Sequence, residues 1–221
     1  MTELVHAGVL EPRVLKRLVR AHVRGHRQKL SPWVVAGPLG FAVAERAASG
    51  REFAKAEAVL VYLADENEVP TGPIIGKAFE RRLKVFLPCC RNGEWGVAPW
   101  HPGRPLRRGA FGVWEPADGP IRLGAEVQEL VAYVPVVAWS TRGARIGRGA
   151  GVYDRLLANL CAKVRVRIVG LAYEFQRTCG PFSESWDVPM EKIYTEKRAL
   201  ELAAPGQERD ERSVNTWKRI S

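Results

Sequence analysis

Short apolar runs separated by helical patterns are the feature of this chain that most restricts its fold. Strands are predicted at residues 58–63, 84–88, 94–99, 111–114, 130–137 and 167–173. Helices are predicted at residues 12–30, 38–48, 72–82 and 150–164. The run 58–63 (AVLVYL) is apolar on both faces, which is typical of a strand buried in a parallel sheet. Alternation of such strands with helices predicts a three-layer α/β/α fold with a mostly parallel sheet.

The length of 221 residues fits one α/β domain better than two. We expect a single domain over residues 1–202, followed by a polar tail over residues 203–221. No stretch is apolar for long enough to cross a membrane, and the N-terminus lacks the basic-then-apolar order of a secretory signal. We therefore expect a cytoplasmic protein without a membrane partner, and a monomer rather than an oligomer.

An excess of basic residues narrows the class of partner. Lys and Arg number 34 against 24 Asp and Glu, which gives a net charge of +10. Such a surplus attracts polyanions, including nucleic acids, nucleotides and phosphorylated or polyglutamylated small molecules, and charge alone does not choose among them. The predicted helix at 12–30 has basic residues but no acidic ones. It must gain stability from core packing, from an anionic partner, or from both.

The segment 141–155 carries the clearest chemical signal in the chain. It follows a predicted strand, opens a predicted helix, and combines glycines with cations: Gly147, Gly149 and Gly151 with Arg142, Arg145 and Arg148. Glycine lets backbone N–H groups approach a ligand, and successive N–H groups before a helix N-terminus form an anion site. Asp154 falls in the first turn of the helix, where it is well placed to hold a divalent cation. The segment therefore predicts a phosphate site.

A purely structural interpretation of the same glycines is a tight connection from strand to helix. The pattern is neither the GxGxxG dinucleotide fingerprint nor a P-loop, so the spacing alone is a weak signal. A turn without a ligand has no need to concentrate three arginines, and we therefore favour the phosphate site.

Residues 145–155, which read Arg-Ile-Gly-Arg-Gly-Ala-Gly-Val-Tyr-Asp-Arg, resemble the signature of the 5-formyltetrahydrofolate cyclo-ligase (5,10-methenyltetrahydrofolate synthetase) family. Further segments resemble that family in the same order: 16–20, 68–71, 84–88, 111–116, 176, 186–190 and 195–196. Agreement of several ordered segments is more specific than any one of them. The resemblance implies a scaffold similar to that of ribose-phosphate isomerases and CoA-transferases.

The resemblance implies ATP-dependent conversion of 5-formyltetrahydrofolate to 5,10-methenyltetrahydrofolate. ADP and phosphate are released, the formyl oxygen is phosphorylated on the way, and ATP and Mg²⁺ are the cofactors. The catalytic residues implied are Arg145, Arg148 and Asp154. The residues implied to bind ATP are Lys16, Arg20, Arg145, Gly147, Arg148, Gly149, Gly151, Tyr153 and Asp154. Those implied to contact the folate are Glu68, Trp95, Trp100 and Phe111, and those implied to hold Mg²⁺ are Asp154 and Asp187.

Four residues at three places depart from the family pattern. Val152 stands where Tyr or Phe is usual, residues 139–140 (Trp-Ser) stand where Phe-Asp is common, and Trp186 stands where some relatives have His. The first two changes leave an alternative open, in which a diverged, non-catalytic member of the family binds RNA or another polyanion. A further alternative is an enzyme on the same scaffold that acts on another substrate. Asp187, for its part, could simply cap the turn before Pro189.

The enzyme and the polyanion binder make different structural demands. An enzyme requires Lys16, Arg20, Arg145 and Asp154 to converge on one pocket. A binder of nucleic acid could leave them on an open face, and its affinity would fall steeply with added salt.

Overall fold

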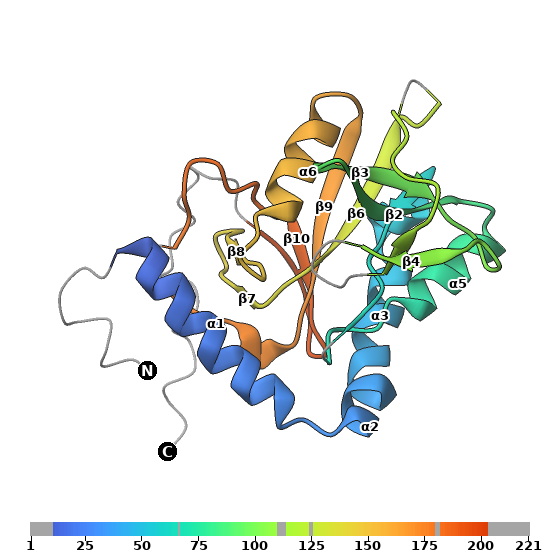
Figure 1. Ribbon diagram of the computed structural model, residues 1–221. Helices are drawn as coiled ribbons and strands as arrows, with labels where there is room; N and C mark the ends of the chain where they lie inside the picture. Colours follow the sequence, from blue (N-terminus) through green and yellow to red (C-terminus); the bar gives the residue numbers. More distant parts are fainter. Residues whose placement is uncertain (1–10, 66, 110–113, 124–125, 180–181, 203–221) are drawn as a thin grey trace, which may run out of the picture.

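The computed structural model describes residues 11–65, 67–109, 114–123, 126–179 and 182–202 (Figure 1). Its centre is a seven-stranded sheet in the order β11-β10-β9-β6-β1-β2-β3. The strands are β1 (Ala58–Leu60), β2 (Lys84–Arg91), β3 (Glu94–Pro99), β6 (Glu129–Pro135), β9 (Arg165–Leu171), β10 (Lys192–Tyr194) and β11 (Ala199–Glu201). Only the pairs at the two edges, β2 with β3 and β10 with β11, are antiparallel. The predicted, mostly parallel sheet is confirmed.

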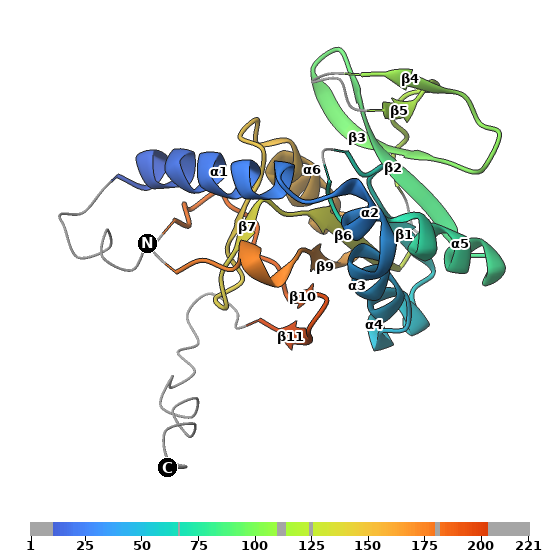
Figure 2. The ribbon, with the colours of Figure 1, turned by 90° about the horizontal axis from the view of Figure 1, so that it is seen from below.

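Helices cover both faces of this sheet, as the three-layer prediction requires (Figures 1 and 2). They are α1 (Pro12–Gln28), α2 (Pro32–Val34), α3 (Gly40–Ala48), α4 (Arg51–Lys55), α5 (Gly72–Glu80) and α6 (Val152–Cys161), with a π-helical turn at Val35–Leu39 and a 3₁₀ turn at Glu174–Gln176. Two small antiparallel pairs lie outside the main sheet: β4 (Leu106–Arg108) with β5 (Trp114–Pro116), and β7 (Ala138–Trp139) with β8 (Arg145–Ile146).

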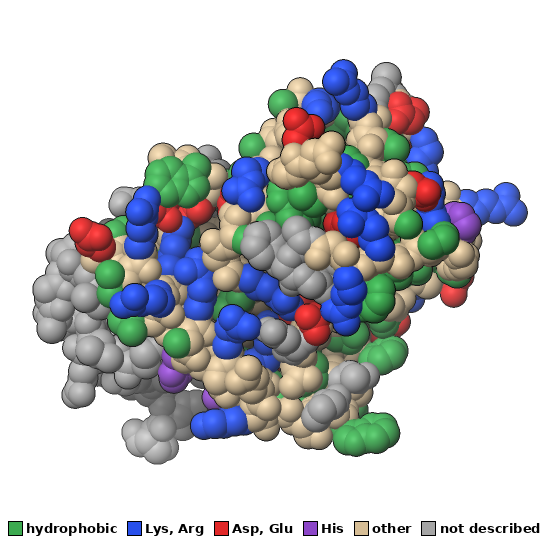
Figure 3. Space-filling view, in the orientation of Figure 1, with side chains coloured by type: hydrophobic (Ala, Val, Ile, Leu, Met, Phe, Trp, Pro, Cys, Tyr) green, Lys and Arg blue, Asp and Glu red, His purple; other side chains and the backbone are tan. Residues whose placement is uncertain are grey.

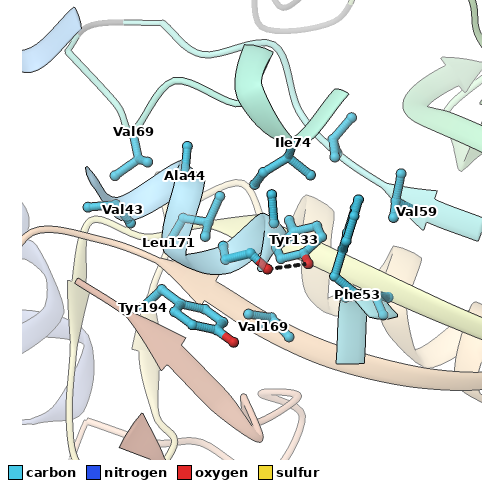
Figure 4. Packing of buried hydrophobic residues seen from close by; sticks show 14 of the residues in the cluster. Val43, Ala44, Phe53, Val59, Val69, Ile74, Tyr133, Val169, Leu171 and Tyr194 are labelled. Atoms are coloured by element: carbon cyan, nitrogen blue, oxygen red, sulfur yellow. Dashed lines mark hydrogen bonds between the residues drawn. The ribbon is translucent and has the colours of Figure 1, made fainter. Parts of the chain in front are cut away.

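The alternation of side chains along each strand divides the core between the two faces. Val59, Val131 and Val169 point to one face and pack with α3, α4 and α5. Figure 4 shows Val59 and Val169 in this cluster with Phe53 and Ile74. Residues one position away on the same strands pack instead against α6 on the other face. Because the strands are apolar on both faces, both helical layers bury them.

Helix α1 belongs to neither layer but crosses the end of the sheet beside β7 (Figure 2). Its buried Val19 and Val23 pack against Val137, Ile146 and Phe182. This contact with the β7–β8 hairpin gives α1 the core packing that its uncompensated basic residues demand. The basic face of α1 is thereby held next to the glycine-rich segment that follows β8.

Two helices begin two residues later than predicted, for backbone reasons. The helix predicted at 38–48 begins at Gly40, because Pro38 lies in the π-helical turn after a non-helical Gly37. The helix predicted at 150–164 begins at Val152, because Gly151 has a left-handed φ of +61°.

The structure contains short strands that the sequence patterns did not predict. The short strands β10 and β11 and both small hairpins were not predicted, apart from a strand at 111–114 that meets β5 only at Trp114. Residues 111–113 lie outside the described part of the chain, as does the predicted tail at 203–221, so the division into domain and tail stays a prediction. No described helix has the length and apolar character needed to span a bilayer.

Candidate active site

A cavity of about 990 Å³ opens at the carboxyl ends of the parallel strands. Its walls include the segment after β1 (Tyr62 to Asp65), the segment after β6 (Pro135 to Val137), the glycine-rich loop and one face of α1. Ligands of open α/β sheets bind at this edge. The lining contains eight basic and five acidic side chains, so the cavity is positive overall. Figure 3 shows Lys and Arg side chains gathered across the face that α1 crosses.

The glycine-rich loop, residues 147–151, joins β8 to α6 and lines the cavity along its length. Gly149 and Gly151 have φ angles of +115° and +61°, which L residues with side chains rarely adopt. Gly147 has no such requirement. The loop therefore delivers the N-terminus of α6, together with Asp154 in its first turn, to the cavity wall. Backbone N–H groups and the helix dipole at this end favour an anion.

Arg145 lies behind the loop, and its side chain is only 3% exposed. Its Nη2 donates to Oδ1 of Asp154 at 2.6 Å, and the same oxygen accepts the Val188 N–H at 3.3 Å. Burial lowers the pKa of Arg145, and Asp154 opposes that shift by stabilising the charged form. The neighbouring Tyr153 is partly buried, and desolvation raises its pKa, so it stays a neutral phenol.

Two further arginines contribute to this site, one from α1 and one from the loop itself. Arg20 of α1 donates from Nε to the Gly147 carbonyl at 2.8 Å, and its guanidinium lies over Gly149. Arg148 donates to Oε1 of Glu68, with Nη2 at 3.1 Å, and lies 3.6 Å from Asp65. Arg142, expected to add charge here, is exposed in the turn between β7 and β8 and does not line the cavity.

Glu68 is nearly buried at the cavity wall, in the segment between β1 and α5. Tyr62 fixes this segment by donating to the Val69 carbonyl at 2.9 Å, and Thr71 donates back to the Tyr62 carbonyl. Burial raises the pKa of Glu68, while Arg148 and Arg27 counteract part of the shift. A carboxyl group with a raised pKa in a cleft is a common feature of functional sites.

Lys16 and Asp187 lie in contact, although the resemblance implies that one binds phosphate and the other metal. The Lys16 ammonium donates to Asp187 Oδ2 at 2.7 Å and to Glu184 Oε2 at 2.5 Å. Asp187 Oδ2 also accepts the N–H of Glu184 at 2.9 Å, so Asp187 does cap a turn, as the structural alternative expected. This turn precedes Pro189, and its Glu184 was missed by sequence reasoning.

The site therefore brings Lys16, Arg20, Arg145 and Asp154 to one cavity, as an enzyme of the expected type requires. Residues 13–196 match the 5-formyltetrahydrofolate cyclo-ligase family. The chain belongs to this family. A Haemophilus influenzae protein named 5-formyltetrahydrofolate cyclo-ligase is 30% identical over 140 residues, which cover 62% of this chain and 74% of that protein. A protein of the same name from Escherichia coli K12 is 29% identical over 150 residues, covering 66% and 81%.

Solved structures of similar proteins agree with the family. The structure of 5,10-methenyltetrahydrofolate synthetase from Aquifex aeolicus has a TM-score of 0.71 and 29% identity, covering 89% of this chain and 97% of that one. The Mycoplasma pneumoniae 5,10-methenyltetrahydrofolate synthetase has a TM-score of 0.63 and 17% identity, covering 82% and 98%. The second likeness supports the fold alone.

The aromatic residues expected to contact folate do not all reach the cavity. Trp95 of β3 lines it. Trp100, just after β3, packs its ring 6.2 Å from that of Phe79 and is not part of the cavity wall. Phe111 lies outside the described residues. Trp114 of β5 lines the cavity and was missed, with Arg108 stacked 4.4 Å over its ring. Its position next to Glu115-Pro116 in the family segment was the available signal.

The departures from the cyclo-ligase family pattern differ in their relation to the cavity. Trp139 is fully buried and donates to the Tyr173 carbonyl, and Ser140 is buried in the turn of the β7–β8 hairpin; neither lines the cavity. Val152 and Trp186 both line it. A change at residues 139–140 therefore acts on the hairpin, whereas Val152 removes an aromatic ring from the wall itself.

Proposed function

We propose that this protein catalyses the ATP-dependent conversion of 5-formyltetrahydrofolate to 5,10-methenyltetrahydrofolate, with release of ADP and phosphate. The observation that carries the proposal is the meeting of three separate elements at one cavity. Lys16 and Arg20 come from α1, Arg145 and the glycine loop from the β8–α6 connection, and Asp187 from the segment before β10. Membership of the cyclo-ligase family supports the same activity.

The cavity offers different chemistry to the two substrates. Backbone N–H groups of residues 147–151 and the guanidinium groups of Arg20, Arg145 and Arg148 suit a triphosphate. Tyr153 would support the same ligand from the first turn of α6. Trp95 and Glu68 line the wall as well and suit a ring system with polar edges. We assign the first set to ATP and the second to the folate.

The proposed reaction needs positioning and charge stabilisation rather than a protein nucleophile. The formyl oxygen attacks the γ-phosphorus of ATP, and the bond from that phosphorus to ADP breaks. The neighbouring folate amine then attacks the activated carbon and loses its proton to solvent, and phosphate leaves with the former formyl oxygen. Arg145 and Arg148 would stabilise the charge on the transferring phosphoryl group, with Asp154 holding Arg145 in place.

The cavity wall offers carboxylate ligands that suit Mg²⁺. Asp154 and Asp187 both line the cavity, and carboxylate oxygens are ligands that Mg²⁺ prefers. The described part of the chain holds no cluster of three or more His, Cys, Asp or Glu side chains that could bind a metal alone. Two carboxylates completed by phosphate oxygens and water fit this ion, which when bound would neutralise phosphate charge.

The alternative of a non-catalytic RNA binder is not favoured by these observations. The cations implied to bind phosphate line a cavity whose wall also contains acidic residues. The relatives in the family are named as enzymes. Its signature would be RNA affinity that falls steeply with added salt.

Turnover tests the proposal. Purified protein is mixed with 5-formyltetrahydrofolate, ATP and Mg²⁺, and the methenyl product is followed by its near-ultraviolet absorbance. We expect product only when both substrates are present. A folded protein that binds ATP but forms no methenyl product would contradict the proposal.

A further inference from the structure

The role of Glu184 follows from its contact with Lys16. The Lys16 ammonium lies 2.5 Å from Glu184 Oε2, with the lysine side chain 8% exposed and the glutamate side chain 16% exposed. Both residues line the cavity. A buried ammonium is costly unless an anion pairs with it, so this contact stabilises the Lys16 side chain and holds it in place when no phosphate is bound.

The turn that contains Glu184 is built to hold this arrangement. Asp187 accepts hydrogen bonds from both Lys16 and the Glu184 backbone, which fixes the Asp187 carboxylate against the turn. On the other side of the Glu184 carboxylate, the Nε atom of the exposed Arg13 lies 3.9 Å from Oε1. The turn uses the backbone of Glu184, whereas Lys16 contacts its side-chain carboxylate. The carboxylate can therefore rotate away from Lys16 without breaking the turn.

A triphosphate at Lys16 would meet these carboxylates at close range. Like charges repel, and their repulsion is strong where water is partly excluded. The influence of the two acids extends to Arg20, because burial lowers the pKa of Arg20 while Asp187 and Glu184 oppose that shift. A phosphate and the Glu184 carboxylate therefore compete for the same cation.

We propose that Glu184 sets the affinity of the cavity for ATP by competing with a phosphate group for Lys16. This inference rests on the proposed function, because it takes ATP as the ligand. Glu184 substitutes for phosphate in the empty site and gives up Lys16 when the nucleotide binds. It is a positioning residue, since it acts through Lys16 rather than on the reacting atoms.

A double-mutant cycle on ATP binding tests this competition. The Kd of ATP is measured by titration calorimetry, without folate, for the wild type, Glu184→Gln, Lys16→Gln and the double variant. We expect Glu184→Gln to tighten ATP binding about fivefold or more when Lys16 is present, and less than about twofold when Lys16 is replaced. Circular dichroism melting curves check that each variant is folded.

Asp65→Asn is the matched control, because Asp65 lines the same cavity at 3.6 Å from Arg148, but its side chain is 58% exposed and water screens its charge. It should change the ATP Kd less than about twofold. If Lys16→Gln does not fold, the comparison of Glu184→Gln with Asp65→Asn carries the test alone.

Three outcomes would overturn the inference. One is equal tightening by Glu184→Gln with and without Lys16, which would mean a general charge effect. Another is equal tightening by Asp65→Asn, and the third is weaker ATP binding by Glu184→Gln. In each case ATP still binds, and the proposed function stands. A wild type that does not bind ATP would instead overturn the proposed function and this inference with it.

Discussion

Arg145 donates a 2.6 Å hydrogen bond to Asp154, which ties the end of β8 to the first turn of α6 across the glycine loop. This pair holds a cation under the loop and fixes the carboxylate proposed to face Mg²⁺. The cavity chemistry depends on both partners, because removing either leaves a buried charge uncompensated.

Replacing Arg145 should reduce activity strongly. Arg145→Gln removes a fixed positive charge from the proposed phosphoryl-transfer site, and we expect kcat/KM to fall about 100- to 1,000-fold. Arg142→Gln is the control, since Arg142 belongs to the same segment but is exposed outside the cavity. Equal losses for the two variants, measured by turnover, would contradict the assignment.

Gly149 should be intolerant of a side chain, whereas Gly147 should accept one. Alanine at 149 would hold a φ of +115°, and its Cβ would lie 3.6 Å from the Arg20 guanidinium carbon. The strain costs about 1–3 kcal/mol, so we expect ATP binding to weaken at least about tenfold. Alanine at 147 meets only Arg145 at 3.5 Å, an ordinary contact. Calorimetry on both variants checks this, and similar Kd values would refute the loop account.

The free energy of unfolding should depend on pH through the titration of Glu68. Its pKa is raised by burial, so the group stabilises the folded state while protonated. That contribution is complete below the unfolded-state pKa of about 4.3 and is lost as pH rises through the higher folded value. Glu68→Gln does not titrate. Urea unfolding from acid to neutral pH should show wild type losing stability relative to the variant, and a constant or opposite trend would disprove it.

Glu52, which lies away from the cavity, should give the opposite pH dependence of stability. Burial alone would raise its pKa, but hydrogen bonds from Tyr194 and Lys192 outweigh burial and lower it. Its stabilisation is therefore present above the unfolded-state pKa and lost as pH falls through the folded value. Glu52→Gln should cost about 3 kcal/mol of unfolding free energy at neutral pH.

Glu45→Gln is the control for Glu52, because Glu45 pairs with Lys77 at the surface with half of its side chain exposed. Denaturant titrations should show a loss below about 0.5 kcal/mol for this variant. Equal losses of unfolding free energy for both variants would show that the hydrogen bonds of Glu52 with Tyr194 and Lys192 stabilise the protein no more than a surface ion pair does.

The sequence predicted the parts of the site that depend on local pattern. The phosphate segment at 145–155 and the basic helix at 12–30 were found because glycines, cations and apolar spacing are visible in one dimension. The Lys16–Glu184 pair was not, because it joins positions 168 residues apart through the tertiary fold. Trp100 was grouped with Trp95 by residue type, and only the fold separates a ring packed on Phe79 from one at the cavity wall.

The fate of the formyl oxygen tests the account most directly. The protein is given ATP, Mg²⁺ and 5-formyltetrahydrofolate labelled with oxygen-18 in the formyl group, and the released phosphate is examined by phosphorus NMR. If the cavity transfers a phosphoryl group to that oxygen, each phosphate released with methenyl product should carry one oxygen-18 atom. Methenyl product accompanied by unlabelled phosphate would contradict phosphorylation of the formyl group.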